Sequence, residues 1–498
     1  MGRFKLLPCF LIIMMKRIYL ILFLIVLLGL TQSVFCKEIN PAEMINNSLN
    51  GSILSPLWGL PFLGMILSIA LFPLLLPDFW KKHFGKVALA WSIVVLTGIA
   101  ISQGTEMSIR TFLSVMIDQF LPFIFLLLTV FTVTGGITLE GEHDGTPKVN
   151  VILLIIGAIL SSWLGTTGAA VLLIRMLIKA NSWRKFKVHT IIFFIFIVGN
   201  IGGTLTPFGN PPLLMGFICK VPFFWPICKL LAPTAFTTFL LIVIYFLIDL
   251  FYYKKEPNKP DYRIKSRITI AGIWNIILLI FTIFAVVLSG YDFGTAFLIY
   301  HVPFPLGELL EILSLLAIIF VSVEITPKEI RALNNFTWHP IIEVGKLFMA
   351  IFICMAPLIA MLTAGKNGPM SFIIHSLSNA NGKPVNGMYY WLSGGLSAFL
   401  DSAPAYLVFF KTAAAPAAAL HMAPNLFMTS IIPTTLIAIT VGASFMGAIT
   451  YIGNAPNMIV KAIAEENNIK MPSFFGYMTW SLLILVPVFL VVQFLFIH

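Results

Sequence analysis

The sequence predicts an all-α polytopic membrane protein made of two inverted repeats of five transmembrane helices, each with a re-entrant helical hairpin and a broken helix. Three observations predict this fold class. Hydrophobic residues make up 59% of the 498 residues and charged residues only 10%, whereas soluble domains carry about 25% charged residues. Long apolar runs recur along the whole chain. A motif rich in Gly, Asn and Pro occurs once in each half.

The N-terminal segment has the pattern of a signal peptide. From Met15 a basic start is followed by an apolar stretch and by small residues, which is the order found in secretory signals. We expect residues 1–36 to be a signal peptide with an upstream extension, and residues 37–55 to be extracytoplasmic. An uncleaved first span is the alternative interpretation.

Ten apolar runs are long enough to be spans, since about 20 residues cross the hydrocarbon core. Five lie on each side of a basic segment, so we expect a first repeat at 56–252, a cytoplasmic linker at 253–267 and a second repeat at 268–498. The runs are 56–76, 87–103, 114–136, 190–219, 230–250, 268–290, 306–323, 345–363, 428–460 and 474–497.

The basic residues orient these spans. With the N-terminus outside, the basic clusters near 81–86, 179–187 and 253–267 fall on the cytoplasmic side, as the positive-inside rule requires. The net charge of +11 is therefore a topology signal, and no nucleic-acid partner is expected. The sequence predicts a multi-pass protein of the bacterial inner (plasma) membrane, surrounded by the lipid bilayer.

Two pairs of shorter apolar segments do not fit as spans. Residues 149–163 and 168–180 are joined by a Gly/Thr turn, and each is only about 20 Å long as a helix. We therefore expect a hairpin that enters the membrane and returns to the same side. Residues 389–400 and 404–416 form a second such pair, which approaches from the opposite side.

The two halves share these features in sequence. SSWLGTTGAA (161–170) aligns with SAFLDSAPAY (397–406), and GNIGGTLTPFGNPP (199–212) aligns with ASFMGAITYIGNAP (443–456). Because each half has an odd number of spans, the second copy must be inverted. Inverted repeats with interrupted helices are the architecture of many secondary transporters, whose site lies where the interruptions meet. In the second alignment Gly203, Thr206, Gly209, Asn210 and Pro212 match Gly447, Thr450, Gly453, Asn454 and Pro456.

The residue types at the breaks suit ion binding. Pro and Gly interrupt each helix, and the freed backbone groups cost several kcal/mol each unless they are satisfied or line a wet cavity. Neutral oxygens at the breaks suit Na⁺, whereas helix N-termini at the hairpin tips suit an anion. Two proline kinks satisfied by neighbouring helices are the structural alternative. The predicted cation/proton-binding residues are Asp401, Thr206, Asn210, Thr450 and Asn454, and the predicted substrate-binding residues are Thr166, Thr167, Ser402, Asn200 and Ser444.

Asp401 is the only acid at a hairpin tip. A carboxylate at mid-bilayer costs roughly 2.5–3.5 kcal/mol on insertion scales. A carboxylate without a binding partner or a function is therefore not expected there. We expect it to ligate a cation when ionised and to take a proton when empty. The alternative is a helix N-cap for residues 404–416, where Asp is favoured.

Other charged residues near the spans are interpreted structurally. Glu343 and Lys346 are expected to pair at the cytoplasmic end of their helix, because they are three residues apart. Asp118, Glu308 and Glu311 fall near the outer ends of spans and are expected to be solvated.

The segments GNIGGTLTPFGNPPLLMGF, LGTTGAAVLLIR and LSAFLDSAPAYLVFF resemble the ion transporter superfamily, and most nearly its NhaD-type sodium:proton antiporters and citrate transporters. The resemblance covers most of residues 55–497. It implies helix bundles that act as a scaffold, two transport hairpins, and a homodimer. The antiporter pattern often has an acid in the first hairpin and GDPP at the first break, but this chain has Gly165, Thr166 and Asn210 there. Two titratable groups are therefore absent.

The leading hypothesis is a Na⁺/H⁺ antiporter that works by alternating access, with Asp401 as the shared carrier. The alternative is a Na⁺- or H⁺-coupled carrier of citrate or another di- or tricarboxylate, held by Thr166, Thr167 and Ser402. An enzyme is not expected, because the sequence has no GxSxG motif and no paired mid-membrane His. A passive channel would not need two inverted hairpins. We expect no cofactor and no metal beyond transported Na⁺, with Na⁺ and H⁺ as the moving ions.

Overall fold

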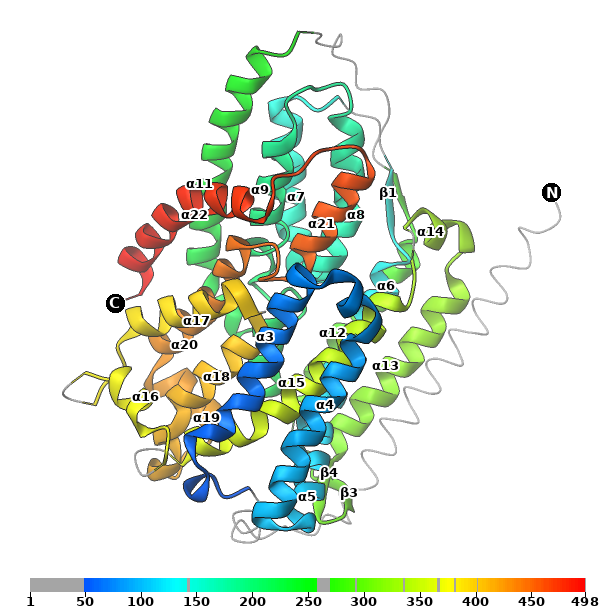
Figure 1. Cartoon of the computed structure of the whole chain (residues 1–498). Coiled ribbons are helices and arrows are strands. Elements are labelled where there is room, and N and C mark those ends of the chain that lie inside the picture. The colour runs from blue at the N-terminus through cyan, green and yellow to red at the C-terminus, as the bar shows by residue number, and fades with distance from the viewer. Residues whose placement is uncertain are drawn as a thin grey trace, which may run out of the picture.

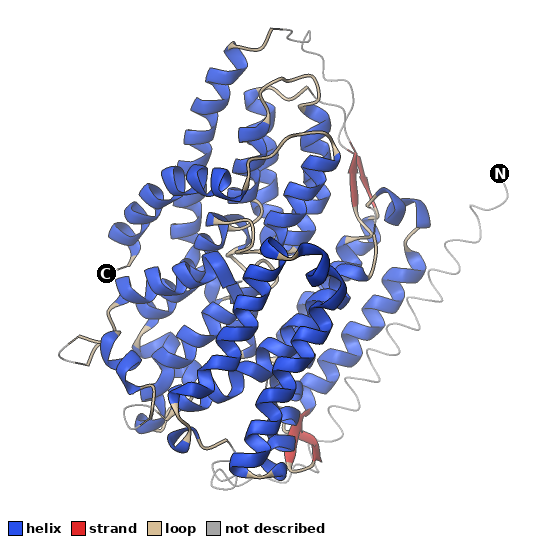
Figure 2. Cartoon of the chain, viewed as in Figure 1, coloured by secondary structure: helices blue, strands red, loops and turns tan. Residues whose placement is uncertain are grey.

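The computed structural model describes residues 49–140, 144–257, 269–291, 293–334, 336–364, 368–379, 382–400 and 402–497. The predicted signal peptide, most of the predicted linker and Asp401 lie outside these residues. Most of the described chain is helical, with two small sheets (Figure 2). The prediction of a helical, polytopic membrane protein is therefore confirmed.

Within the described residues, eight helices are long and apolar enough to cross a membrane. The number is below the predicted ten, because the expected spans 190–219 and 428–460 are interrupted and 268–290 contains a helix of only 17 residues. The eight segments are Pro56–Pro73, Asp78–Gln103, Thr105–Thr134, Pro147–Leu164, Trp225–Lys254, Leu306–Ile325, Ile341–Thr363 and Phe474–Phe496.

One bundle contains helices from both halves of the chain (Figure 1). The first-half helix α6 packs on α12 and α13, while α3 and α4 pack on α15. Asn275 joins the halves, because its Nδ2 donates to the Gly136 carbonyl (2.9 Å) and its Oδ1 accepts from Ser322 (2.7 Å). The elements are α3 (Leu60–Leu75), α4 (Pro77–Gln103), α5 (Thr105–Val115), the π-helical η4 (Met116–Phe120), α6 (Leu121–Thr134), α12 (Ile273–Ser289), α13 (Leu306–Ile325), α14 (Lys328–Leu333) and α15 (His339–Thr363).

Two short antiparallel sheets were not predicted. Strand β1 (Thr138–Glu140) pairs with β2 (Thr269–Ala271), so the end of α6 is tied to the start of α12. Strand β3 (Thr295–Ile299) pairs with β4 (Val302–Pro305) between α12 and α13. Both are too short to show a period in the sequence, and each depends on pairing with a second segment.

The remaining helices form the two hairpins and the two broken helices. The first half contains α7 (Pro147–Leu164), α8 (Thr166–Ala180), α9 (Val188–Ile197), the 3₁₀ turn η5 (Ile201–Gly203), α10 (Pro211–Ile218) and α11 (Trp225–Lys254). The second half contains α16 (Ser371–Ser376), α17 (Asn386–Leu400), α18 (Ser402–Ala414), η7 (Ala415–Leu420), α19 (Pro424–Leu426), η8 (Phe427–Ile431), α20 (Pro433–Met446), η9 (Gly447–Ile449), α21 (Ala455–Glu466) and α22 (Phe474–Phe496).

The first hairpin arm is longer than the sequence predicted. Helix α7 has 18 residues, which is about 27 Å at 1.5 Å per residue. The prediction that this segment is too short to cross is therefore wrong, because the helix already begins at Pro147, after the N-cap Thr146, whose hydroxyl accepts from Val149 N. Its re-entrant path through the membrane stays a prediction.

Burial separates a core from a lipid-facing layer. In α9, residues 189–197 are all buried, which explains why this segment is apolar on every side. In contrast, Phe239 of α11 and Phe494 of α22 are 65% and 78% exposed. Large exposed apolar surfaces on several long helices fit contact with lipid rather than water.

Candidate functional site

The two broken helices meet at a group of four buried asparagines, Asn200, Asn210, Asn454 and Asn457, which we name the asparagine cluster. Asn200 Nδ2 donates to Asn457 Oδ1 (2.8 Å). Asn454 Nδ2 donates to Asn200 Oδ1 (3.0 Å) and to the Gly199 carbonyl (3.1 Å). The structure therefore brings together three predicted site residues, Asn200, Asn210 and Asn454, from opposite halves of the chain.

Asn457 was missed by the sequence analysis. Its Nδ2 donates to the carbonyls of Gly447 (2.9 Å) and Thr450 (2.8 Å), and so satisfies backbone that the second break sets free. The alignment of the two breaks ends at Pro456, and the next position pairs Asn457 with Leu213. A search for matching residues in the two halves therefore could not find it.

In both halves a threonine hydroxyl at the break donates a hydrogen bond to a backbone carbonyl of the neighbouring hairpin. The Thr206 hydroxyl donates to the Ser162 carbonyl, and the Thr450 hydroxyl donates to the Ala398 carbonyl. These are matched positions in both sequence alignments, since Thr206 aligns with Thr450 and Ser162 with Ala398. The two predicted threonines thus hold the hairpins against the breaks, in addition to any role in ion binding.

Neighbouring helices satisfy much of the freed backbone. Ser162 Oγ donates to the Gly202 carbonyl (2.5 Å) and accepts from Leu205 N (3.2 Å) at the first break. At the second break, the Tyr477 and Ser481 hydroxyls of α22 donate to the carbonyls of Ala448 (2.8 Å) and Ile449 (2.6 Å). The structural alternative, breaks satisfied by protein, therefore accounts for these carbonyls, and evidence for a ligand must come from side chains.

Two predicted site residues supply that evidence. Within the described residues, Asn210 Nδ2 and Ser444 Oγ are buried and have no hydrogen-bond partner. Asn210 is 1% exposed and Ser444 is 0% exposed. An unsatisfied buried polar group costs about 1–3 kcal/mol. A ligand that accepts hydrogen bonds would remove this cost.

The first hairpin tip touches the first break. The backbone N–H of Thr166 donates to the Gly209 carbonyl (2.8 Å), and Gly165 before it has φ +77°, a conformation that favours glycine. Thr166 is 3% exposed, and Thr167 is half-buried. In the second hairpin, Ser402 is fully buried at the start of α18. Asp401 lies outside the described residues, so its role stays a prediction.

Glycines let the chain cross itself at both breaks. A Cβ placed on Gly209 would lie 2.1 Å from the Gly203 carbonyl oxygen, and one on Gly453 would lie 2.6 Å from the Gly447 oxygen. Both distances are far below van der Waals contact. The four glycines are matched pairs in the alignment, so a close chain crossing is common to the two halves.

Gly209→Ala is expected to destabilise the first break, because the new methyl group must push the Gly203 backbone away. Overpacking of this kind costs about 1–3 kcal/mol. Gly395→Ala is the matched control, since no atom of the described residues lies within 4 Å of its Cβ position and Ala favours the helix. Thermal unfolding of the two purified variants in detergent measures the difference in their stability. Equal midpoints for the two variants would show that the crossing tolerates a side chain.

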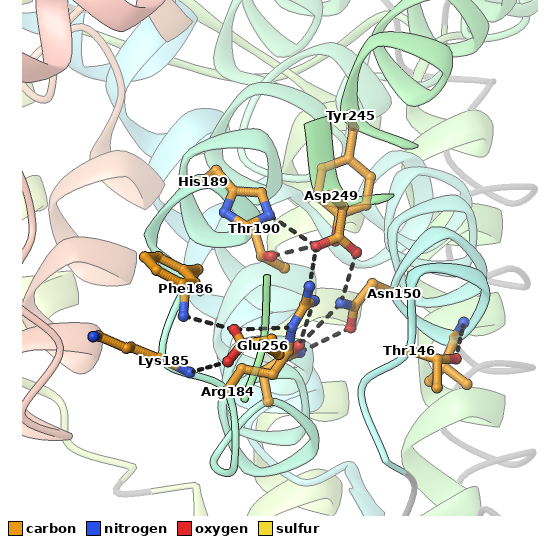
Figure 3. Close-up of polar contacts among 12 residues, drawn as sticks. Thr146, Asn150, Arg184, Lys185, Phe186, His189, Thr190, Tyr245, Asp249 and Glu256 are labelled. Carbon is orange, nitrogen blue, oxygen red and sulfur yellow. Dashed lines mark hydrogen bonds and ion pairs between the residues drawn. The ribbon is translucent and has the colours of Figure 1, made fainter. Parts of the chain in front are cut away.

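A second buried polar network lies where α7, α8, α9 and α11 approach one another (Figure 3). Arg184 Nη2 lies 2.6 Å from Asp249 Oδ1, and His189 Nε2 lies 2.8 Å from the same oxygen. The side chains of Arg184 and Asp249 are 0% exposed. We name Asn150, Asn181, Arg184, His189, Asp249 and Glu256 the charged brace.

The charged brace connects four segments. Asn150 of α7 and Asn181 donate to each other (2.8 and 3.0 Å), and Glu256 accepts from the backbone N–H groups of Lys185 (3.0 Å) and Phe186 (2.8 Å). Arg184 was predicted only as a topology residue and Asp249 was not singled out. Asp249 is the only acid of the apolar helix α11. An acid within an apolar helix is usually paired or functional, so this feature of the sequence could have identified Asp249.

Three other predictions for charged residues have mixed outcomes. Asp118 is exposed, as expected. Glu308 and Glu311 are not solvated, since they are only 8% and 5% exposed. The predicted pair of Glu343 with Lys346 is wrong: Glu343 lies 3.9 Å from His339 Nδ1, one turn away, and the Lys346 ammonium lies over the ring of Phe84.

Comparison with known proteins identifies the family. The family model described as "Putative citrate transport" matches residues 51–497. No curated protein matches the chain. The chain therefore belongs to this family, and its apolar helices make it a multi-pass membrane transporter.

Proposed function

We propose that the protein is a secondary active transporter that carries citrate or another di- or tricarboxylate, coupled to Na⁺ or H⁺, by alternating access. The observation that supports this is a pair of buried groups, Asn210 Nδ2 and Ser444 Oγ, that have no hydrogen-bond partner in the part of the chain that the structure describes. The Asn210 amide N–H groups can donate to a carboxylate, and so can the Ser444 hydroxyl. The description of the family, citrate transport, agrees with an anionic substrate.

The proposal places the substrate beside the asparagine cluster. Asn200, Asn210 and Ser444 would contact it, together with the tip residues Thr166, Thr167 and Ser402. The tip residues begin α8 and α18, and helix N-termini favour negative charge. The coupling cation would use the oxygens of Thr206, Thr450 and Asn454 with Asp401.

We propose that residues 56–252 and 268–498 are two inverted repeats of one structural unit. The matched contacts Thr206–Ser162 and Thr450–Ala398 support a common unit in the two halves. So do the matched glycine crossings. We also propose a location in the bacterial inner membrane and a homodimer, with no enzymatic activity and no cofactor.

Na⁺/H⁺ antiport is the second candidate. It is favoured by Asp401, which stands directly between α17 and α18 as the only acid at a hairpin tip. In this candidate Asp401 binds Na⁺ and H⁺ alternately, and no carboxylate is carried. Asp401→Asn is then expected to abolish Na⁺-dependent proton movement in everted vesicles, and full activity of this variant would remove Asp401 from the mechanism.

Flux into proteoliposomes separates the two candidates. We expect radiolabelled citrate to accumulate when an inward Na⁺ or H⁺ gradient is imposed, and not without one. Na⁺ or Li⁺ movement coupled to H⁺ with no citrate uptake would decide for antiport. Citrate flux that persists without any ion gradient would contradict both and indicate a passive pathway.

A further inference from the structure

A cavity of about 330 Å³ lies between α10, with the loop that follows it, and the helices α6, α12 and α13. This volume is at the lower end of the roughly 300–1,000 Å³ typical of small-molecule sites. None of the asparagine cluster lines it. It is therefore a separate space from the proposed transport site. Among the residues that line it are Leu126, Phe217, Phe223, Val287, Glu308 and Glu311.

Two buried acids give the cavity its charge. Glu308 and Glu311 are three residues apart at the start of α13 and therefore lie on one face. Glu311 Oε2 accepts from the Ser289 hydroxyl at 2.5 Å. Glu308 Oε1 lies 3.4 Å from Lys220 Nζ, whose side chain is 55% exposed. Among the described residues that line the cavity there are thus two acids and one ammonium group, that of Lys220.

One carboxylate oxygen is left over. Glu308 Oε2 is buried and has no hydrogen-bond partner within the described residues, although the residue is only 8% exposed and lines the cavity. Burying a carboxylate oxygen without a donor is costly. A ligand that brings an N–H donor with a positive charge would satisfy this oxygen and balance the second acid.

The walls of the cavity define the rest of the ligand. Most lining side chains are apolar, and Phe217 and Phe223 lie edge to face beside it, with ring centroids 6.1 Å apart. A bare metal ion needs several oxygens around a much smaller space. Aromatic rings also attract organic cations. We propose that this cavity binds an organic ammonium ion with an apolar body, whose N–H groups donate to Glu308 Oε2.

The site goes beyond the proposed transport function and does not depend on it. Lys220 follows α10, and Glu308 belongs to α13, so the ion pair joins the two sides of the cavity. A bound ammonium ion would contact both sides at once. The expected consequence of binding is a protein that is harder to unfold, whatever its substrate.

The test is calorimetric titration of the purified protein in detergent with 2-phenylethylammonium. We expect saturable binding with one site per chain, and no binding of 2-phenylethanol, which has the same body without the charge. Glu308→Gln is expected to weaken binding about 10-fold or more, as loss of a charged hydrogen-bond partner does. Glu106→Gln, at an exposed acid of α5, is the matched control and is expected to change nothing.

Val287→Phe tests the same site without touching an acid. Val287 is half-buried and lines the cavity, so the larger ring is expected to fill it and abolish binding even if Glu308→Gln fails to fold. Equal binding of the alcohol, or unchanged binding in both variants, would overturn the proposal.

Repeating the titration in nanodiscs identifies the natural source of the ammonium. Weaker binding with phosphatidylethanolamine than with phosphatidylcholine, whose headgroup has no N–H donor, would support a lipid headgroup as the occupant. Equal binding in the two lipids would support a soluble amine. Failure of this site leaves citrate flux unaffected, so the two proposals are tested separately.

Discussion

Asp249→Asn is expected to lower the free energy of unfolding by about 3–5 kcal/mol, the usual cost of removing one partner of a buried ion pair. The substitution keeps the shape of the side chain but removes the charge that Arg184 and His189 share. Arg184 is 2% exposed, so water cannot replace the lost carboxylate. The variant would leave a guanidinium group buried without its closest counter-ion.

The measurement is thermal or denaturant unfolding of the purified protein in detergent. Glu106→Gln is again the matched control, because Glu106 pairs with Arg110 one turn away on α5 and its side chain is 59% exposed. The Arg110 side chain is 16% exposed, and a pair with one exposed member at the surface is expected to contribute about 1 kcal/mol. If Asp249→Asn loses no more stability than Glu106→Gln, the charged brace does not stabilise the fold.

A double replacement tests whether the uncompensated charge of Arg184 causes the loss of stability in Asp249→Asn. Arg184→Met with Asp249→Leu removes both charges, and buried pairs replaced by apolar residues are often as stable as before. We expect the double variant to recover much of the loss in Asp249→Asn. Recovery would show that the penalty comes from the uncompensated charge rather than from the missing contact.

The sequence predicted the features that leave a local pattern. Apolar runs located most spans, and Pro with Gly located both breaks, at 204–210 and 450–454. The small sheets and the extension of α7 to Pro147 were missed, because they depend on strand pairing and on an N-cap at Thr146. Such features involve few residues and leave little periodicity to detect.

The residues that come together at the breaks could be predicted where the two halves align in sequence and not elsewhere. Asn210 and Asn454 were found because they align, and the structure places both in the asparagine cluster. Asn457 and Asp249 have no matching residue in an alignment, and their roles depend on partners 257 and 65 residues away in the chain, Asn200 and Arg184. Contacts over such separations arise only from the folded arrangement of the helices.

Asn210→Ala is expected to raise the KM for citrate about 10-fold or more while the protein still folds. The change removes the two N–H donors that no described protein group accepts. A hydrogen bond to a charged group contributes about 1.5–3 kcal/mol, and each 1.4 kcal/mol is about tenfold in affinity. Radiolabelled citrate uptake over a range of concentrations measures the effect.

Asn210→Asp separates the two candidate functions, because it replaces the N–H donors of Asn210 Nδ2 by a negatively charged carboxylate oxygen at the same position. Beside a carboxylate substrate, like charges cost several kcal/mol, so citrate uptake is expected to fall about 100-fold or more. Beside a cation the same charge is favourable, and the substitution changes GNPP at the first break to the GDPP that the antiporter pattern often has there. An antiporter would therefore keep or strengthen its Na⁺ response. Asn468→Asp adds the same charge at an exposed position after α21 and controls for net charge. Citrate uptake by Asn210→Asp equal to that of Asn468→Asp would place the substrate away from the first break.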